Sequence, residues 1–254
     1  MSYVLRFSSI VLIVSLAVLW LSLQMGVFIR KRRRNLEQNE REDYGMIMSA
    51  ILTLLGLIIG FSFSMAITRY DARKTLEGAE ANAISTEYVR AEFLPPPYSA
   101  KVRALLRDYL DQRLLFYTTR EEGGLAQIEA KTAQLDDELW SAVQAPTAAQ
   151  PTAPLTIAAM GMNDVSSSRG STQAAWLNRI PNAAWALMVV IAIFCNVLIG
   201  YGARRGEART TLLLVLPLVI AISFTLIADI DAPRGGVVRV RAQNLESLSK
   251  SLRR

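Results

Sequence analysis

The stretch Met46–Ile67, MIMSAILTLLGLIIGFSFSMAI, decides the class of this protein. Its 22 residues carry no charge. At about 1.5 Å per residue, a helix of this length spans about 33 Å and can cross a hydrocarbon core of about 30 Å. Nothing breaks the helical pattern from Gly45 to Leu94, where a run of three prolines follows. The sequence therefore predicts one long helix that crosses a membrane and continues beyond it.

Small and polar residues mark one side of this predicted helix. They recur at steps of three and four residues, so they share one narrow face: Ser49, Thr53, Gly56, Gly60 and Ser64. Gly56 and Gly60 also form a G-x-x-x-G pair, the spacing at which two membrane helices approach closely. Two interpretations stay open, namely a lining for an ion path or a contact with another helix, within or between protomers. A path would need several copies of the chain, because four helices enclose little space.

Three further apolar runs are long enough to span a membrane. They are Phe7–Ile29, Ala183–Gly202 and Thr210–Ala228. Positive charge follows the first run, the reverse of a cleaved signal peptide. Together the runs predict an all-α integral membrane protein with four transmembrane helices. We expect helices 1 and 2 with a short basic loop at 1–67, an extramembrane helical region at 68–181, helices 3 and 4 at 182–228, and a C-terminal tail at 229–254.

The region 68–181 is helical in pattern throughout. One apolar stripe follows the prolines and consists of Val102, Leu105, Leu106, Tyr109, Leu110 and Leu114. A second stripe follows a heptad and consists of Leu125, Ile128, Thr132, Leu135, Leu139 and Ala142. We expect both stripes to pack inside a helical bundle. The segment 145–154, APTAAQPTAP, predicts a linker, with a short helix at 155–165 and a flexible piece at 166–170 after it.

Composition excludes several kinds of site. The chain has no histidine and one cysteine, Cys195, so it can form neither a His/Cys zinc site, a Ser-His-Asp triad nor an internal disulfide. No spacing of carboxylates indicates a metal site or a catalytic site, and we expect no cofactor and no enzyme activity. Much of the excess positive charge lies beside the apolar runs, where membrane topology explains it, so nucleic acid is not an expected partner.

Several short motifs resemble a known family. They are Arg69-Tyr70-Asp71-Ala72-Arg73, Glu80-Ala81-Asn82-Ala83-Ile84, Leu94-Pro95, NRIPNAAWAL at Asn178–Leu187, and IADIDAPRGGVVRV at Ile227–Val240. Over about 45–248 the chain is similar to the bestrophin-like family of bacterial membrane proteins, a domain of unknown function. Bestrophins are anion channels with four membrane helices and long helical extensions. The resemblance therefore implies a candidate ion channel, without assigning any pore residue.

Two signals disagree about orientation. The short loops Arg30–Tyr44 and Ala203–Arg209 are rich in arginine, and such loops stay in the cytoplasm. This places the region 68–181 on the periplasmic side of a bacterial inner membrane. Bestrophins instead keep both termini and their helical region in the cytoplasm, and the basic C-terminal tail agrees with that arrangement. We adopt the orientation that the short loops predict.

Other polar residues each have two interpretations. Asn196, in the third membrane helix, predicts an interhelical hydrogen bond or a site contact. A polar cluster is expected at the outer membrane edge, as an ion-pair collar or an ion-selecting vestibule: Arg69, Asp71, Arg73, Asp229, Asp231 and Arg234. Glu80 and Asn82, beyond the membrane, form either a buried hydrogen-bonding point in the bundle or a solvated face.

Two functions stay open on this basis. One is an oligomeric channel for inorganic ions, anions by the family resemblance. The other is a non-catalytic envelope scaffold or sensor that binds a protein partner through its helical region. In both, the chain is a multi-pass homo-oligomer in the lipid bilayer of the inner membrane.

Overall fold

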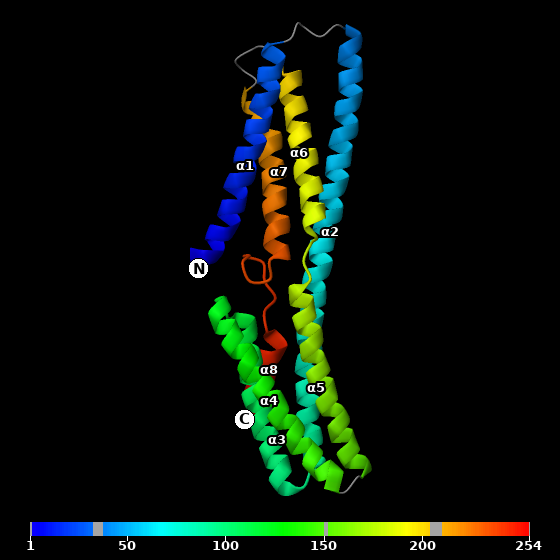
Figure 1. Ribbon diagram of the computed structural model, residues 1–254, viewed down its shortest axis with the longest axis vertical. Helices are drawn as coiled ribbons and strands as arrows, with labels where there is room; N and C mark the ends of the chain where they lie inside the picture. Colours follow the sequence, from blue (N-terminus) through cyan, green and yellow to red (C-terminus); the bar gives the residue numbers. More distant parts are fainter. Residues whose placement is uncertain (1, 33–37, 150–151, 204–209, 254) are drawn as a thin grey trace. The chain divides into compact units, whose positions relative to one another are not determined.

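The computed structural model describes residues 2–32, 38–149, 152–203 and 210–253, and this part of the chain contains helices and no strand (Figure 1). Four helical stretches are long and apolar enough to cross a membrane. The predicted all-α membrane architecture is therefore confirmed. Residues 33–37 and 204–209, which carry most of the arginines of the two short loops, lie outside the described residues. The chain divides into two compact units, Met1–Arg69 with Arg179–Arg239, and Tyr70–Asn178 with Val240–Arg254.

The first unit contains the membrane-spanning helices. In Figure 1, α1 (Ser2–Lys31), α6 (Asn182–Gly202) and α7 (Thr210–Asp231) lie side by side. Two glycines allow α1 and α6 to approach closely. A Cβ atom on Gly26 would lie 2.0 Å from the carbonyl oxygen of Val197, and one on Gly200 would lie 2.0 Å from that of Leu23. Any larger side chain at either glycine would push the two helices apart.

The long helix predicted around Met46–Ile67 is also present. Helix α2 runs without interruption over Gln38–Arg90, and the 3-10 turn η1 (Ala91–Phe93) ends it just before the prolines. Its first part belongs to the membrane unit, where the Tyr44 hydroxyl donates a hydrogen bond to the Leu198 carbonyl oxygen of α6. Its last part belongs to the second unit.

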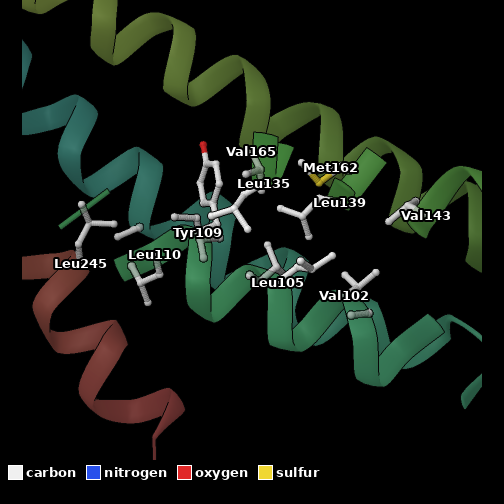
Figure 2. Packing of buried hydrophobic residues seen from close by; sticks show 14 of the residues in the cluster. Val102, Leu105, Tyr109, Leu110, Leu135, Leu139, Val143, Met162, Val165 and Leu245 are labelled. Atoms are coloured by element: carbon white, nitrogen blue, oxygen red, sulfur yellow. The ribbon is translucent and has the colours of Figure 1, made fainter. Parts of the chain in front are cut away.

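The second unit is a helical bundle. The end of α2 packs there with α3 (Pro96–Thr118), α4 (Glu122–Ala149), α5 (Ala153–Leu177) and α8 (Gln243–Leu252). Figure 2 shows its apolar core, where Val102, Leu105 and Tyr109 of α3 meet Leu135 and Leu139 of α4. Met162 and Val165 of α5 and Leu245 of α8 complete the core. Most residues of both apolar stripes predicted from the sequence are therefore in the core, and Leu114 and Leu125 pack against it.

The bundle differs from the sequence expectation in its linkers and in its tail. The predicted linker at 145–154 is mostly helical, since α4 continues through Pro146 to Ala149 and α5 begins at Ala153. Proline removes one helical hydrogen-bond donor, and the alanines around it are strong helix formers. The piece at 166–170 is helical as well. Its Ser166 hydroxyl donates to the Asp136 carboxylate at 2.7 Å, and Arg169 forms an ion pair with the same residue at 3.3 Å.

The C-terminal tail is not a separate part. Its helix α8 packs in the bundle, and the Glu77 carboxylate of α2 accepts the N–H groups of Asn244 at 2.9 Å and Leu245 at 3.0 Å. A carboxylate that accepts the first N–H groups of a helix is a strong N-terminal cap.

Candidate functional site

Helix α2 has a buried face and an exposed face within the membrane unit. Leu55, Ser62 and Ala66 are at most 5% exposed and pack against the rest of the unit. The five small and polar residues Ser49, Thr53, Gly56, Gly60 and Ser64 are all exposed. At about 100° per residue, this set lies on roughly the opposite side of the helix from the buried residues. The predicted small-polar face is thus directed away from the protomer.

The glycines of this face do not serve packing within the protomer. A Cβ atom added at Gly56 or Gly60 would meet nothing within 4 Å in the described part of the chain, in contrast to Gly26 and Gly200 of the α1–α6 contact. Glycine inside a helix costs about 1 kcal/mol relative to alanine. The protomer gains no close helix approach in return. Within the described part of the protomer the pair makes no helix contact, and the predictions of a contact with a neighbouring protomer or of an open path stay as predictions.

The hydroxyl groups of the face are held by their own helix. The Ser49 hydroxyl donates to the Met46 carbonyl oxygen at 3.0 Å, and the Thr53 hydroxyl donates to the Ser49 carbonyl oxygen at 2.8 Å. Each hydroxyl oxygen keeps lone pairs that face outward. The face is therefore narrow and weakly polar, with small side chains. Such a face suits the passage of ions or a contact with another helix.

Asn196 does not belong to this face. Its side chain is fully buried in the membrane unit, and its amide donates to the Ala192 carbonyl oxygen of the same helix at 2.8 Å. Its side-chain oxygen has no hydrogen-bond partner among the described residues. The predicted interhelical bond is thus absent within the described part of the protomer, and Asn196 shares no surface with the exposed face of α2.

The two aspartates after the fourth membrane helix organise the backbone. Asp229 accepts the N–H groups of Val237 and Val238 at 2.8 Å and the hydroxyl of Ser8. Asp231 accepts the N–H of Ile180, at 3.1 Å to each oxygen. Both carboxylates are at most 6% exposed. They pin the turn after α7 and the entry into α6, two of the segments that carry the family resemblance.

The other members of the predicted membrane-edge cluster are distributed over both units. Arg73 is buried in the second unit and donates to the Ala175 carbonyl oxygen at 3.1 Å and the Asn178 carbonyl oxygen at 3.0 Å, where α5 ends. Arg69 and Arg234 are half-buried in the first unit, and Asp71 is exposed. These hydrogen bonds to backbone groups were not predicted. They tie helix ends together, and the predicted ion-pair collar stays a prediction.

Glu80 and Asn82 have different environments. Glu80 is fully buried and forms an ion pair with Arg113 of α3, while Asn82 is exposed, so the two form no pair. The Glu80 carboxylate also accepts the hydroxyls of Tyr117 at 3.2 Å and Thr172 at 3.3 Å. Arg113 was missed by the sequence analysis, although it lies one turn from Tyr109 on the apolar face of α3. A charge on an apolar face was the available signal.

Glu87 was also missed. Its carboxyl group is fully buried on α2, and neither oxygen has a hydrogen-bond partner in the described residues. A Cβ atom on Gly161 of α5 would lie 1.9 Å from Oε2, so the carboxyl group packs directly on this glycine. Burial raises the pKa of Glu87 to about 8, against the lowering effect of Arg90, and Asp164 raises it further. This group is therefore mostly uncharged at neutral pH.

The sequence profile of the Bestrophin-like domain matches residues 11–245. The chain belongs to the bestrophin-like family. The match includes most of the first apolar run, all of the other three, the exposed face of α2 and the two buried aspartates at the end of α7. The family expected from the short motifs is thereby confirmed. Among curated protein sequences, none matches this chain.

Solved structures of bacterial bestrophin homologues have the same fold. A variant from Klebsiella pneumoniae is 11% identical, with a TM-score of 0.68 over 96% of each chain. Another structure of a homologue from this organism is 12% identical, with a TM-score of 0.66 over 92% of this chain and 96% of the other. At this identity the likeness shows the fold alone. The bestrophin-like protein is a multi-pass membrane protein with the bestrophin fold.

Proposed function

We propose that this bestrophin-like protein assembles into a homo-oligomeric ion channel in which the exposed face of α2 lines the conduction path. One observation supports this most strongly. Gly56 and Gly60 lie on a face that points away from the protomer, with nothing within 4 Å of their Cβ positions. When several copies surround one axis, small residues on such a face leave an open lumen, and hydroxyl oxygens and backbone can replace part of an ion's hydration shell.

One further observation concerns the ion and another the assembly. The homologues that share its fold are bestrophin homologues, and bestrophins are anion channels, so anions are the proposed cargo. Large apolar side chains are also exposed in the helical bundle outside the membrane helices, where a monomer in water would leave them uncovered. They include Val89 at 60%, Met160 at 63% and Leu177 at 82% exposure. Contacts between protomers would bury such side chains.

The proposed location is the inner membrane of a bacterium. The arginine-rich short loops support a cytoplasmic position for both loops, so the proposed position of the bundle of α3, α4, α5 and α8 is the periplasm.

The experiment that tests the channel compares the reversal potentials of three proteins in planar bilayers under a salt gradient. Ser64→Glu places one carboxylate per protomer on the exposed face, and Ser64→Gln is a neutral control of the same size. We expect Ser64→Glu to shift the reversal potential toward cations, with a smaller shift at high salt, because charged rings set selectivity and salt screens them. Ser64→Gln should leave it unchanged. No current from well-folded oligomers over a range of voltages would reject the channel and favour the scaffold.

A further inference from the structure

A pocket of about 220 Å³ lies at one end of the membrane-spanning helices α6 and α7. Its lining consists of Arg179, Ile180, Asn182, Trp185, Ala228, Asp231 and Ala232. These residues come from the entry into α6, the first turn of α6 and the end of α7. Because both helices cross the membrane, the pocket lies where the hydrocarbon core meets the lipid headgroups.

Arg179 and the start of α6 give the pocket two kinds of hydrogen-bond donor that suit a phosphate group. The Arg179 side chain is exposed and forms no hydrogen bond or ion pair within the described part of the chain. A guanidinium group binds phosphate oxygens through two parallel hydrogen bonds. Helix α6 begins here, and its first N–H groups have no helical acceptor. The N–H groups of Ala184 and Trp185 bond to the Pro181 carbonyl oxygen, and those of Asn182 and Ala183 have no acceptor among the residues that the structure describes.

Asp231 adds negative charge to the lining of the pocket. Asp231 is 6% exposed and is fixed by the Ile180 N–H, so its carboxylate cannot swing away. The Asp231 carboxylate disfavours a purely anionic ligand, whereas a ligand with an ammonium group beside its phosphate matches both charges of the lining. The volume is also smaller than the about 300–1,000 Å³ of pockets for drug-sized ligands, which suits a group as small as a lipid headgroup.

The lining residue Trp185 contacts the membrane-spanning part of α7. Trp185 is half-buried and its ring packs edge-on against Phe224, with 6.3 Å between centroids. Tryptophan is enriched at the headgroup level of a membrane. Its position in this pocket therefore agrees with a ligand from the lipid surface.

We propose that this pocket binds the headgroup of phosphatidylethanolamine, with the phosphate on Arg179 and the α6 N-terminus, and the ammonium group beside Asp231. Such a lipid joins the ends of α6 and α7 at the membrane surface. It contacts neither the exposed face of α2 nor any residue of the proposed conduction path.

The test is native mass spectrometry of the full-length protein in detergent, titrated separately with phosphatidylethanolamine, phosphatidylglycerol, inorganic phosphate and glycerophosphoethanolamine. Arg179→Gln removes the cation, and Ala232→Leu fills the pocket. Lys31→Gln is the matched control, because Lys31 is also an exposed cation at the end of a membrane helix and follows Arg30, which donates to the Tyr201 carbonyl oxygen near the end of α6. Intact secondary structure is checked by circular dichroism for each variant.

We expect the original protein and Lys31→Gln to bind phosphatidylethanolamine, and to bind phosphatidylglycerol more weakly. Arg179→Gln should bind phosphatidylethanolamine about tenfold more weakly, because it loses a charge-assisted hydrogen bond to the phosphate. Ala232→Leu should abolish binding. Arg179→Gln still tests the site if Ala232→Leu fails to fold. Equal binding by Arg179→Gln, or an equal loss in Lys31→Gln, would overturn the proposal. Displacement of the lipid by inorganic phosphate or glycerophosphoethanolamine at equal concentration would overturn the lipid as the occupant.

Discussion

The ion pair between Glu80 and Arg113 allows the packing of the helical bundle to be tested by a double-mutant cycle. Both side chains are fully buried. Arg113 Nη2 lies 3.3 Å from Glu80 Oε2, its Nε bonds the other oxygen, and its guanidinium lies 4.4 Å from the centre of the Phe116 ring. Arg113 Nη1 has no hydrogen-bond partner in the described residues. The guanidinium therefore depends on Glu80 for nearly all the compensation of its buried charge.

The expected magnitudes follow from this burial. Glu80→Gln leaves the Arg113 charge uncompensated, and Arg113→Met leaves the Glu80 carboxylate with only the hydroxyls of Tyr117 and Thr172. Removing one partner of a buried pair costs about 3–5 kcal/mol of the free energy of unfolding. The double variant contains no buried charge, and the amide that replaces the Glu80 carboxylate still accepts both hydroxyls, so we expect a loss of about 1 kcal/mol. The two single effects are thus strongly non-additive.

The assay is denaturant unfolding in detergent, followed by the fluorescence of Trp176. Its ring lies 5.1 Å from Phe116 and 5.4 Å from Tyr117, and the other three tryptophans are replaced by phenylalanine in all variants. Asp111→Asn is the control, because its pair with Arg253 is exposed and is expected to contribute only about 0–1 kcal/mol. Additive single effects, or a loss in Asp111→Asn as large as in Glu80→Gln, would refute the reasoning.

Three further predictions concern the bundle, the assembly and the topology. The folded-state pKa of Glu87 is about 8 and its ordinary value is 4.5, so its stabilising effect is complete below about pH 4.5 and is lost as the pH rises through about 8. Glu87→Gln should flatten the fall of the melting temperature between pH 5 and 9, and an unchanged fall would assign it to other groups. Gly56→Leu with Gly60→Leu should weaken the oligomer by about 1–3 kcal/mol or block current while membrane insertion is retained, measured by cross-linking and bilayer recording. Unchanged assembly and current would place the face against lipid. In a background without native cysteine, an impermeant thiol reagent should label Gly123→Cys and not Gln38→Cys in spheroplasts, and the reverse pattern would invert the topology.

Much of the fold follows from patterns that one sequence displays. The uncharged stretch Met46–Ile67 predicts its membrane span because length and apolarity are local properties, and the helix continued to the prolines as expected. The stripes at Leu105 and Leu135 became core for the same reason. The linker prediction at 145–154 was too long, because the prolines and small residues predicted a break in the chain there. In the structure α4 continues to Ala149, and the hydrogen bond between Ser166 of α5 and Asp136 of α4 holds the two helices against each other.

The polar contacts could not be predicted in the same way. Glu80 pairs with Arg113 across 33 positions, and Arg73 bonds to Ala175 across 102. The apolar face of α3 marks Arg113 as a buried charge, but nothing local identifies which residue it pairs with, because the partner of a buried charge depends on tertiary packing. The face of α2 is an intermediate case. The sequence showed which residues share it, and the structure showed that it points away from the protomer.

The most direct test of the central claim places a cysteine on the exposed face of α2 during current recording. Thr53→Cys carries the thiol on this face, and Leu54→Cys is the matched control, since Leu54 is 45% exposed but lies about 100° around the helix. The native Cys195 is fully buried and can remain. A positively charged methanethiosulfonate reagent should change the current through Thr53→Cys several-fold and leave Leu54→Cys unaffected. Equal sensitivity of both variants, or a response of Leu54→Cys alone, would contradict conduction along this face.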